Sequence, residues 1–144
     1  MAEPLLSADA IERLLAQEFP QVFHPGSGLS IESVTTAGCL LRQQYQERFV
    51  RPGGTISGPT MMALADYAMY VAVLAAIGPV PLAVTTNFTI NFLRKPAKAD
   101  ILAEARLLKL GTRLAVGEVT LFSDGMAEAV AHVTSTYSVP DRTS

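Results

Sequence analysis

The stretch Arg51-Pro-Gly-Gly-Thr-Ile-Ser-Gly-Pro59, followed directly by an apolar run over residues 60–77, decides the fold of this chain. The glycines and prolines of the first part predict a turn. The second part predicts one long helix, over residues 59–77, that ends at Gly78-Pro79. A single carboxylate, Asp66, lies in the middle of that helix. Because a charge in an apolar helix is costly unless it is paired, Asp66 is a candidate for chemistry.

Composition excludes several classes of protein. The 144 residues suit one domain, and a hydrophobic content of 49% with only 17% charged residues favours burial of surface between subunits. The net charge is −2 and the sequence contains no basic run, so it does not indicate a surface that binds nucleic acid. The single cysteine, Cys39, excludes an internal disulfide and fits a reducing, cytoplasmic compartment.

No membrane or secretory segment is expected. The N-terminus lacks a basic region followed by a sustained apolar one, so no signal peptide is predicted. The long helix approaches membrane-spanning length, but Asp66 at its centre favours a buried helix of a soluble protein.

The remaining pattern predicts strands around this helix. A first helix is capped by Ser7 and ended by Pro20, and strands are expected over residues 29–36, 38–50, 82–93, 100–110, 113–123 and 126–138. Asp124-Gly125 predicts a tight two-residue hairpin. In the strand over residues 82–93, one face should carry Val84, Thr86, Phe88, Ile90 and Phe92.

A run of long strands with one substantial helix implies antiparallel pairing. One sheet can cover only part of a helix that is apolar nearly all round, so a second subunit could cover the rest. We therefore predict an α+β hotdog fold, in which an antiparallel sheet of five to six strands wraps a long central helix. It forms a single domain over residues 1–144, with residues 1–28 as an N-terminal helix and loop.

Three pieces of the chain resemble a known family: Gly54-Thr55-Ile56-Ser57-Gly58-Pro59, Leu64-Ala65-Asp66 and Ile90-Asn91-Phe92-Leu93-Arg94-Lys95-Pro96. Their order and spacing resemble the PaaI-like hotdog acyl-CoA thioesterases of the hydroxybenzoyl-CoA thioesterase superfamily. The resemblance implies hydrolysis of an acyl-CoA thioester to free acid and CoA. It assigns Asp66 as base or nucleophile, the Gly58 backbone N–H as donor to the carbonyl, and Thr85 as a residue that helps to place water.

The sequence departs from the family pattern at three positions. Ser57 replaces a histidine, Pro59 replaces a second glycine, and Arg51 replaces an asparagine; Lys95 resembles a one-residue insertion. We interpret Ser57 as a helix cap rather than a nucleophile. These departures keep open a non-catalytic acyl-CoA-binding or regulatory protein as the alternative.

A hotdog hydratase or dehydratase is a weaker alternative. Such enzymes use a histidine with an acid, and neither His24 nor His132 has such a neighbour at motif spacing. The same spacing argument predicts no metal site. No cofactor is expected either, since CoA is part of the substrate.

Helix geometry predicts a shared site. Gly58 and Asp66 are eight residues apart, which is about 12 Å along one helix, so a single carbonyl cannot touch both. The reaction therefore needs two subunits, and the family suggests that such homodimers join into a homotetramer.

Further residues are candidates for substrate binding, either in an apolar acyl slot or against the CoA phosphates. They are Arg51, Ser57, Met62, Tyr67, Tyr70, Phe88, Arg94, Lys95 and Arg113. The identity of the acyl group, and the choice between water activation and a covalent route, stay open.

Overall fold

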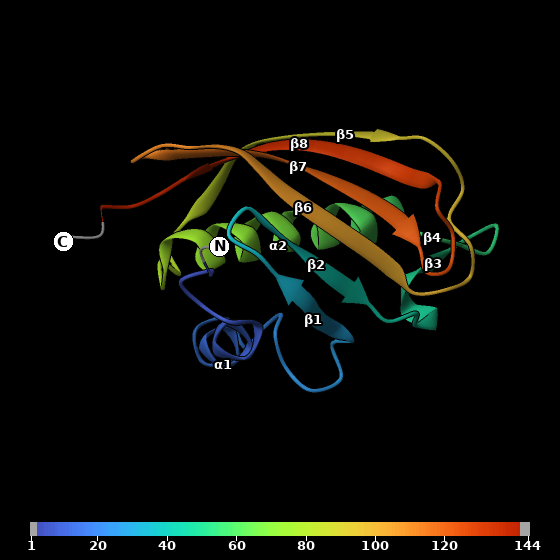
Figure 1. Cartoon of the computed structure of the whole chain (residues 1–144). Coiled ribbons are helices and arrows are strands. Elements are labelled where there is room, and N and C mark those ends of the chain that lie inside the picture. The colour runs from blue at the N-terminus through green and yellow to red at the C-terminus, as the bar shows by residue number, and fades with distance from the viewer. Residues whose placement is uncertain (1–2, 142–144) are drawn as a thin grey trace.

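Six antiparallel strands form one sheet that curves around a single long helix, as Figure 1 shows. The computed structural model describes residues 3–141, so the first two and last three residues of the predicted domain lie outside the described part. The helices are α1 (Ala8–Glu18) and α2 (Gly58–Ile77). The sheet runs in the order β1 (Leu29–Val34), β2 (Gly38–Gln43), β6 (Ile101–Leu110), β7 (Leu114–Ser123), β8 (Ala129–Ser138) and β5 (Val84–Phe92). The predicted α+β hotdog architecture is confirmed.

Local sequence signals set both ends of α2. The Ser57 side chain accepts a hydrogen bond from the Thr60 N–H, and Pro59 occupies the first turn, where its missing N–H costs nothing. Gly78 ends the helix with a φ of 98°, and its N–H donates to the Leu74 carbonyl. The helix thus begins one residue earlier than predicted.

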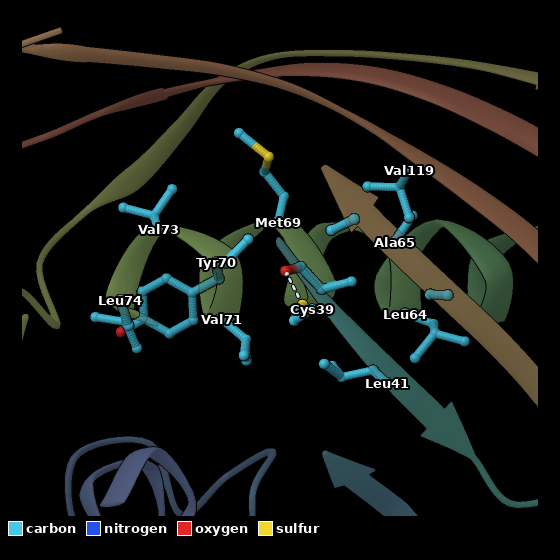
Figure 2. Close-up of a cluster of buried hydrophobic side chains, with 14 of the residues drawn as sticks. Cys39, Leu41, Leu64, Ala65, Met69, Tyr70, Val71, Val73, Leu74 and Val119 are labelled. Atoms are coloured by element: carbon cyan, nitrogen blue, oxygen red, sulfur yellow. Dashed lines mark hydrogen bonds between the residues drawn. The ribbon is translucent and has the colours of Figure 1, made fainter. Parts of the chain in front are cut away.

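The concave face of the sheet buries most of α2. Leu64, Ala65 and Met69 of the helix pack with Leu41 of β2 and Val119 of β7 in the core that Figure 2 shows. By length and composition α2 could also cross a membrane, but most of its apolar window is buried. Packing against the sheet therefore accounts for its apolar character.

Cys39 is part of this core. Its thiol donates to the Ala68 carbonyl at 3.1 Å, the dashed line in Figure 2. Burial raises the pKa of the thiol to about 12. Cys39 therefore acts as a small buried side chain rather than a reactive one.

One strip of α2 remains open. Met62 is 39% exposed, and Ala63, Asp66 and Tyr67 are only partly buried. These residues recur at three- and four-residue spacing, so they share one face of the helix. The sheet thus covers only part of α2, as predicted.

Two predicted strands end earlier than the sequence indicated. The strand expected over residues 38–50 stops at Gln43, and a 3₁₀ turn (Glu47–Phe49) leads into the small hairpin of β3 (Val50–Arg51) and β4 (Thr55–Ile56). The Tyr45 N–H donates to an Asp100 carboxylate oxygen at 2.8 Å, which replaces a strand partner. The first strand ends at Val34 because the Thr35 N–H turns back to the Gly38 carbonyl.

The hairpin between β7 and β8 is longer than predicted. The turn at Asp124-Gly125 is present, with a φ of 84° at the glycine and a hydrogen bond from the Met126 N–H to the Ser123 carbonyl. However, β8 resumes only at Ala129, so residues 124–128 form the connection. The Ala129 carbonyl accepts from the Arg94 guanidinium, which lies outside the hairpin.

A β-bulge changes which side chains of β5 face the helix. The register shifts between Thr85 and Asn87, so the predicted alternation is wrong on the N-terminal side of this point. Thr85 lies on the inner face with Phe88 and Ile90, and Val84 is instead 58% exposed. The extra residue at the bulge thus turns Thr85 towards α2.

Candidate active site

Asp66 accepts two hydroxyl hydrogen bonds on one carboxylate oxygen. Thr85 donates to its Oδ1 at 2.6 Å, and Tyr137 donates to the same atom at 2.9 Å. Within the described part of the chain, no donor is recorded for Oδ2. The carboxylate therefore has one anchored oxygen and one available for chemistry.

The structure brings together Asp66 and Thr85, which sequence reasoning had paired, and adds Tyr137. Tyr137 lies 71 residues after Asp66, in the last strand. No motif or spacing in the sequence connects the two. The one available signal is a large aromatic residue among small ones, in Thr134-Ser-Thr-Tyr-Ser138.

A pocket of about 480 Å³ opens beside this carboxylate. Asp66 and Thr85 line it, and its walls include the aromatic rings of Phe19, Tyr67 and Tyr70. The Phe19 ring meets the Tyr67 ring edge-on, with centroids 6.2 Å apart. Polar groups thus converge on one side of a largely aromatic hollow, as is typical of small-molecule sites.

The tyrosines of the pocket are held as neutral donors. Burial, and then the negative charge of Asp66, raise the pKa of Tyr67 above its usual value. The same two causes raise the pKa of Tyr137. Burial, and then the charge of Glu18, raise the pKa of Tyr70. These phenols therefore stay protonated rather than acting as phenolate bases, and Tyr70 and Tyr137 donate hydrogen bonds.

Gly58 lies in the first turn of α2, eight residues before Asp66. No acceptor for its N–H is recorded among residues 3–141, and the helix dipole adds positive potential there. A Cβ at this position would come within 3.3 Å of the Phe92 ring. Glycine therefore allows close packing of the first turn of α2 against Phe92 of β5.

Ser57 acts as the cap that its position predicted. Its Oγ lies 3.3 Å from the Thr60 nitrogen and 2.8 Å from the Thr60 hydroxyl. The structure brings no histidine or carboxylate to it within the described residues, so nothing there would activate it as a nucleophile.

The basic candidates lie on turns outside the pocket. Arg94 forms an ion pair with Glu128 at 2.8 Å, and Lys95 and Arg113 are exposed. The Lys98 side chain reaches the turn between β3 and β4, since a Cβ on Gly54 would lie 3.4 Å from it. That turn follows the exposed Arg51, so two basic residues from distant segments lie at the β3–β4 hairpin, whose second strand precedes α2 in the chain.

The apolar candidates separate into two groups. Tyr67 and Tyr70 line the pocket, whereas Phe88 packs against the core and Met62 lies on the open strip of α2. Tyr67 also lines a second hollow of about 310 Å³, which extends past Thr60 towards the first turn of α2. The two hollows therefore flank the Tyr67 side chain.

The histidines lie away from Asp66. His24 lines the second hollow. The structure adds a neighbour that no motif spacing indicates, because His132 Nε2 lies 3.4 Å from Glu118 on the adjacent strand. His132 and Glu118 are on the outer face of the sheet, since the residues on either side of each, in β8 and β7, are buried. In the described residues no cluster of three potential metal ligands occurs.

Comparisons with known proteins agree with this fold. A protein from Silicibacter sp. TM1040, named provisionally as a thioesterase, has a solved structure that is 47% identical, with a TM-score of 0.86 over 96% of this chain and 94% of that one. Zebra fish thioesterase superfamily member 2 shares the fold at 20% identity, with a TM-score of 0.80 over 94% of this chain and 99% of that one.

A curated relative and a family model extend the comparison. A protein of Saccharolobus solfataricus, named provisionally as an esterase, is 29% identical over 136 residues, or 94% of this chain and 87% of that protein. The family model of the thioesterase superfamily matches residues 53–130, which contain β4, α2, β5, β6 and β7 and reach the start of β8. The chain belongs to the thioesterase superfamily.

Proposed function

We propose that this protein hydrolyses an acyl-CoA thioester to the free acid and CoA, at a site formed by two subunits. Membership of the thioesterase superfamily supports hydrolysis of a thioester. The single observation that carries the proposal is Asp66, half-buried beside an aromatic pocket with one carboxylate oxygen held by two hydroxyls. Such a group is suited to act as a base on water.

The proposed reaction needs one base and one oxyanion donor. Asp66 takes a proton from water, and the water oxygen adds to the thioester carbon. The Gly58 N–H donates to the oxyanion that develops, and the carbon–sulfur bond then breaks. The leaving thiolate takes up the proton held by Asp66. Direct attack by Asp66, followed by hydrolysis of the resulting anhydride, stays the alternative route.

A shared site follows from the distance between the two groups. Eight residues of α2 separate Gly58 from Asp66, about 12 Å along the axis, so each carbonyl would meet Gly58 of one subunit and Asp66 of the other. Two features support a partner here. The strip around Met62 and Asp66 is open, and among residues 3–141 β5 pairs with β8 alone, which leaves its other edge without a strand partner there.

The CoA phosphates would lie near the start of α2. Two features support this: Arg51 and the Lys98 side chain lie at the β3–β4 hairpin that precedes α2, and the helix dipole attracts anions at the first turn. Arg94 is less suited, because Glu128 already neutralises it.

The test is a panel of acyl-CoAs of varied chain length and aromaticity, with a thiol-reactive dye to detect CoA. We expect release with at least one member of the panel, and a loss of about 10³-fold or more in kcat for Asp66→Asn, because the amide cannot act as a base. Binding of acyl-CoA without release, by calorimetry, would instead support the non-catalytic alternative.

A further inference from the structure

Tyr137 connects the carboxylate of Asp66 to the backbone of its own helix. The tyrosine hydroxyl lies 2.9 Å from Asp66 Oδ1 and 2.9 Å from the Asp66 backbone oxygen. Tyr137 is only 3% exposed, so this hydroxyl has little access to bulk water. The hydroxyl has one proton, which these two oxygens share, so the contact holds the carboxylate group relative to α2 in addition to the hydrogen bond from Thr85.

The ring of Tyr137 is itself held in place. It stacks on the Tyr70 ring, with centroids 6.1 Å apart and an interplanar angle of 22°. The Tyr70 hydroxyl donates to the Pro81 carbonyl at 2.7 Å, in the loop between α2 and β5. Tyr70 therefore supports Tyr137 without a recorded hydrogen bond to Asp66.

Hydroxyl groups, rather than cations, surround Asp66 within its subunit. The titratable groups around the pocket are Tyr67 and Tyr70 of α2, Tyr137 of β8 and Glu18 at the end of α1. No Lys, Arg or His is among the described residues that line it. The recorded partners of the carboxylate in the described residues are therefore hydroxyl donors, and burial keeps Tyr137 a donor by raising its pKa.

We propose that Tyr137 is a positioning residue, which together with Thr85 occupies Oδ1 and directs Oδ2 towards the attacking water. This inference rests on the proposed function. The water proton goes to Oδ2 and the oxygen adds to the thioester carbon. When the carbon–sulfur bond breaks, the thiolate receives that same proton, so Asp66 is regenerated.

The experiment compares Tyr137→Phe with the wild type over a range of pH. Loss of one of two donors destabilises the carboxylate, so the acid limb of kcat/KM should move up by about one pH unit. At the pH optimum, kcat should fall roughly tenfold while KM changes little, because Tyr137 acts through Asp66.

Tyr70→Phe is the matched control. It removes a hydroxyl from the same pocket, but one that donates to Pro81 rather than to Asp66. Tyr70→Phe can change KM, but the pH at which kcat/KM falls on the acid side should be the same as in the wild type. If Tyr137 had only a structural role, neither Tyr137→Phe nor Tyr70→Phe would move the acid limb of kcat/KM.

A second substitution covers the case in which Tyr137→Phe does not fold. Incorporation of 3-fluorotyrosine at position 137 keeps the hydroxyl and makes it a stronger donor. The acid limb should then move to lower pH, the opposite direction, because a stronger donor favours the carboxylate.

The outcomes separate the two proposals. If Asp66→Asn still releases CoA at the wild-type rate, the proposed function fails. If Asp66→Asn is inactive but neither change at position 137 moves the acid limb, the positioning role of Tyr137 is wrong and the proposed function stands.

Discussion

At the scale of single residues, the asymmetry of the Asp66 carboxylate is the central feature of the site. Thr85 donates its proton to Oδ1, and its oxygen keeps lone pairs that can accept from a water beside Oδ2. The water-placing role predicted for Thr85 is therefore compatible with its contact to Asp66. One hydroxyl can orient both the base and the nucleophile.

Ser57→Ala tests the cap at the start of α2. The substitution removes the acceptor for the Thr60 N–H, so the free energy of unfolding should fall by about 1 kcal/mol. Chemical denaturation measures this change. Ser57→Asp restores an acceptor and should recover most of the loss. If it recovers none, the capping interpretation is wrong.

At the scale of elements, close approach between β2 and β6 is a firm constraint on the sheet. A Cβ on Gly38 would lie 2.1 Å from the Ala105 backbone oxygen, a distance that no side-chain movement can relieve. The beginning of β2 therefore requires glycine because of the neighbouring strand, and not because of its own backbone conformation.

Gly38→Ala should destabilise the protein by about 2–4 kcal/mol, because the strand pair must separate to make room. Thermal unfolding measures the effect. Gly111→Ala is the control, since its nearest atom is 3.3 Å away and it also lacks a positive φ. Equal losses of stability for the two variants would contradict this interpretation.

At the scale of the whole molecule, the fold exposes two surfaces that could pair with a second subunit. The unpaired edge of β5 and the open strip of α2 both belong to the region that carries Gly58, Phe92 and Asp66. If the site is divided between subunits, two variants that are inactive alone should restore activity when combined, which a site within one subunit would not allow.

Mixing two inactive variants should restore activity. In a dimer of Asp66→Asn with Gly58→Val, one site combines the intact Gly58 with the intact Asp66, and the other site carries both changes. Random exchange of subunits makes half of the dimers mixed, so about a quarter of the wild-type activity should return. Denaturation and refolding of the mixture, followed by the CoA assay, measures this. If a mixture that is shown to contain mixed dimers recovers no activity, the site is not shared between subunits.

Sequence reasoning succeeded where the signal is local. The cap at Ser57, the glycine that ends α2 and the apolar run that makes it the core helix all act over a few residues, so pattern alone locates them. The isolation of Asp66 in that run was equally visible. Pattern alone did not locate the end of β2 or the start of β8, because these depend on contacts with Asp100 and Arg94 from other segments.

The sequence by itself determined the long helix, the presence of the strands and the isolation of Asp66 in that helix, since each follows from composition over a short window. Only the tertiary structure decided what surrounds that acid. A bulge turned Thr85 inward, and sheet order brought Tyr137 to a residue 71 positions earlier. Such contacts depend on register and on strand pairing between distant segments, and no local pattern encodes them.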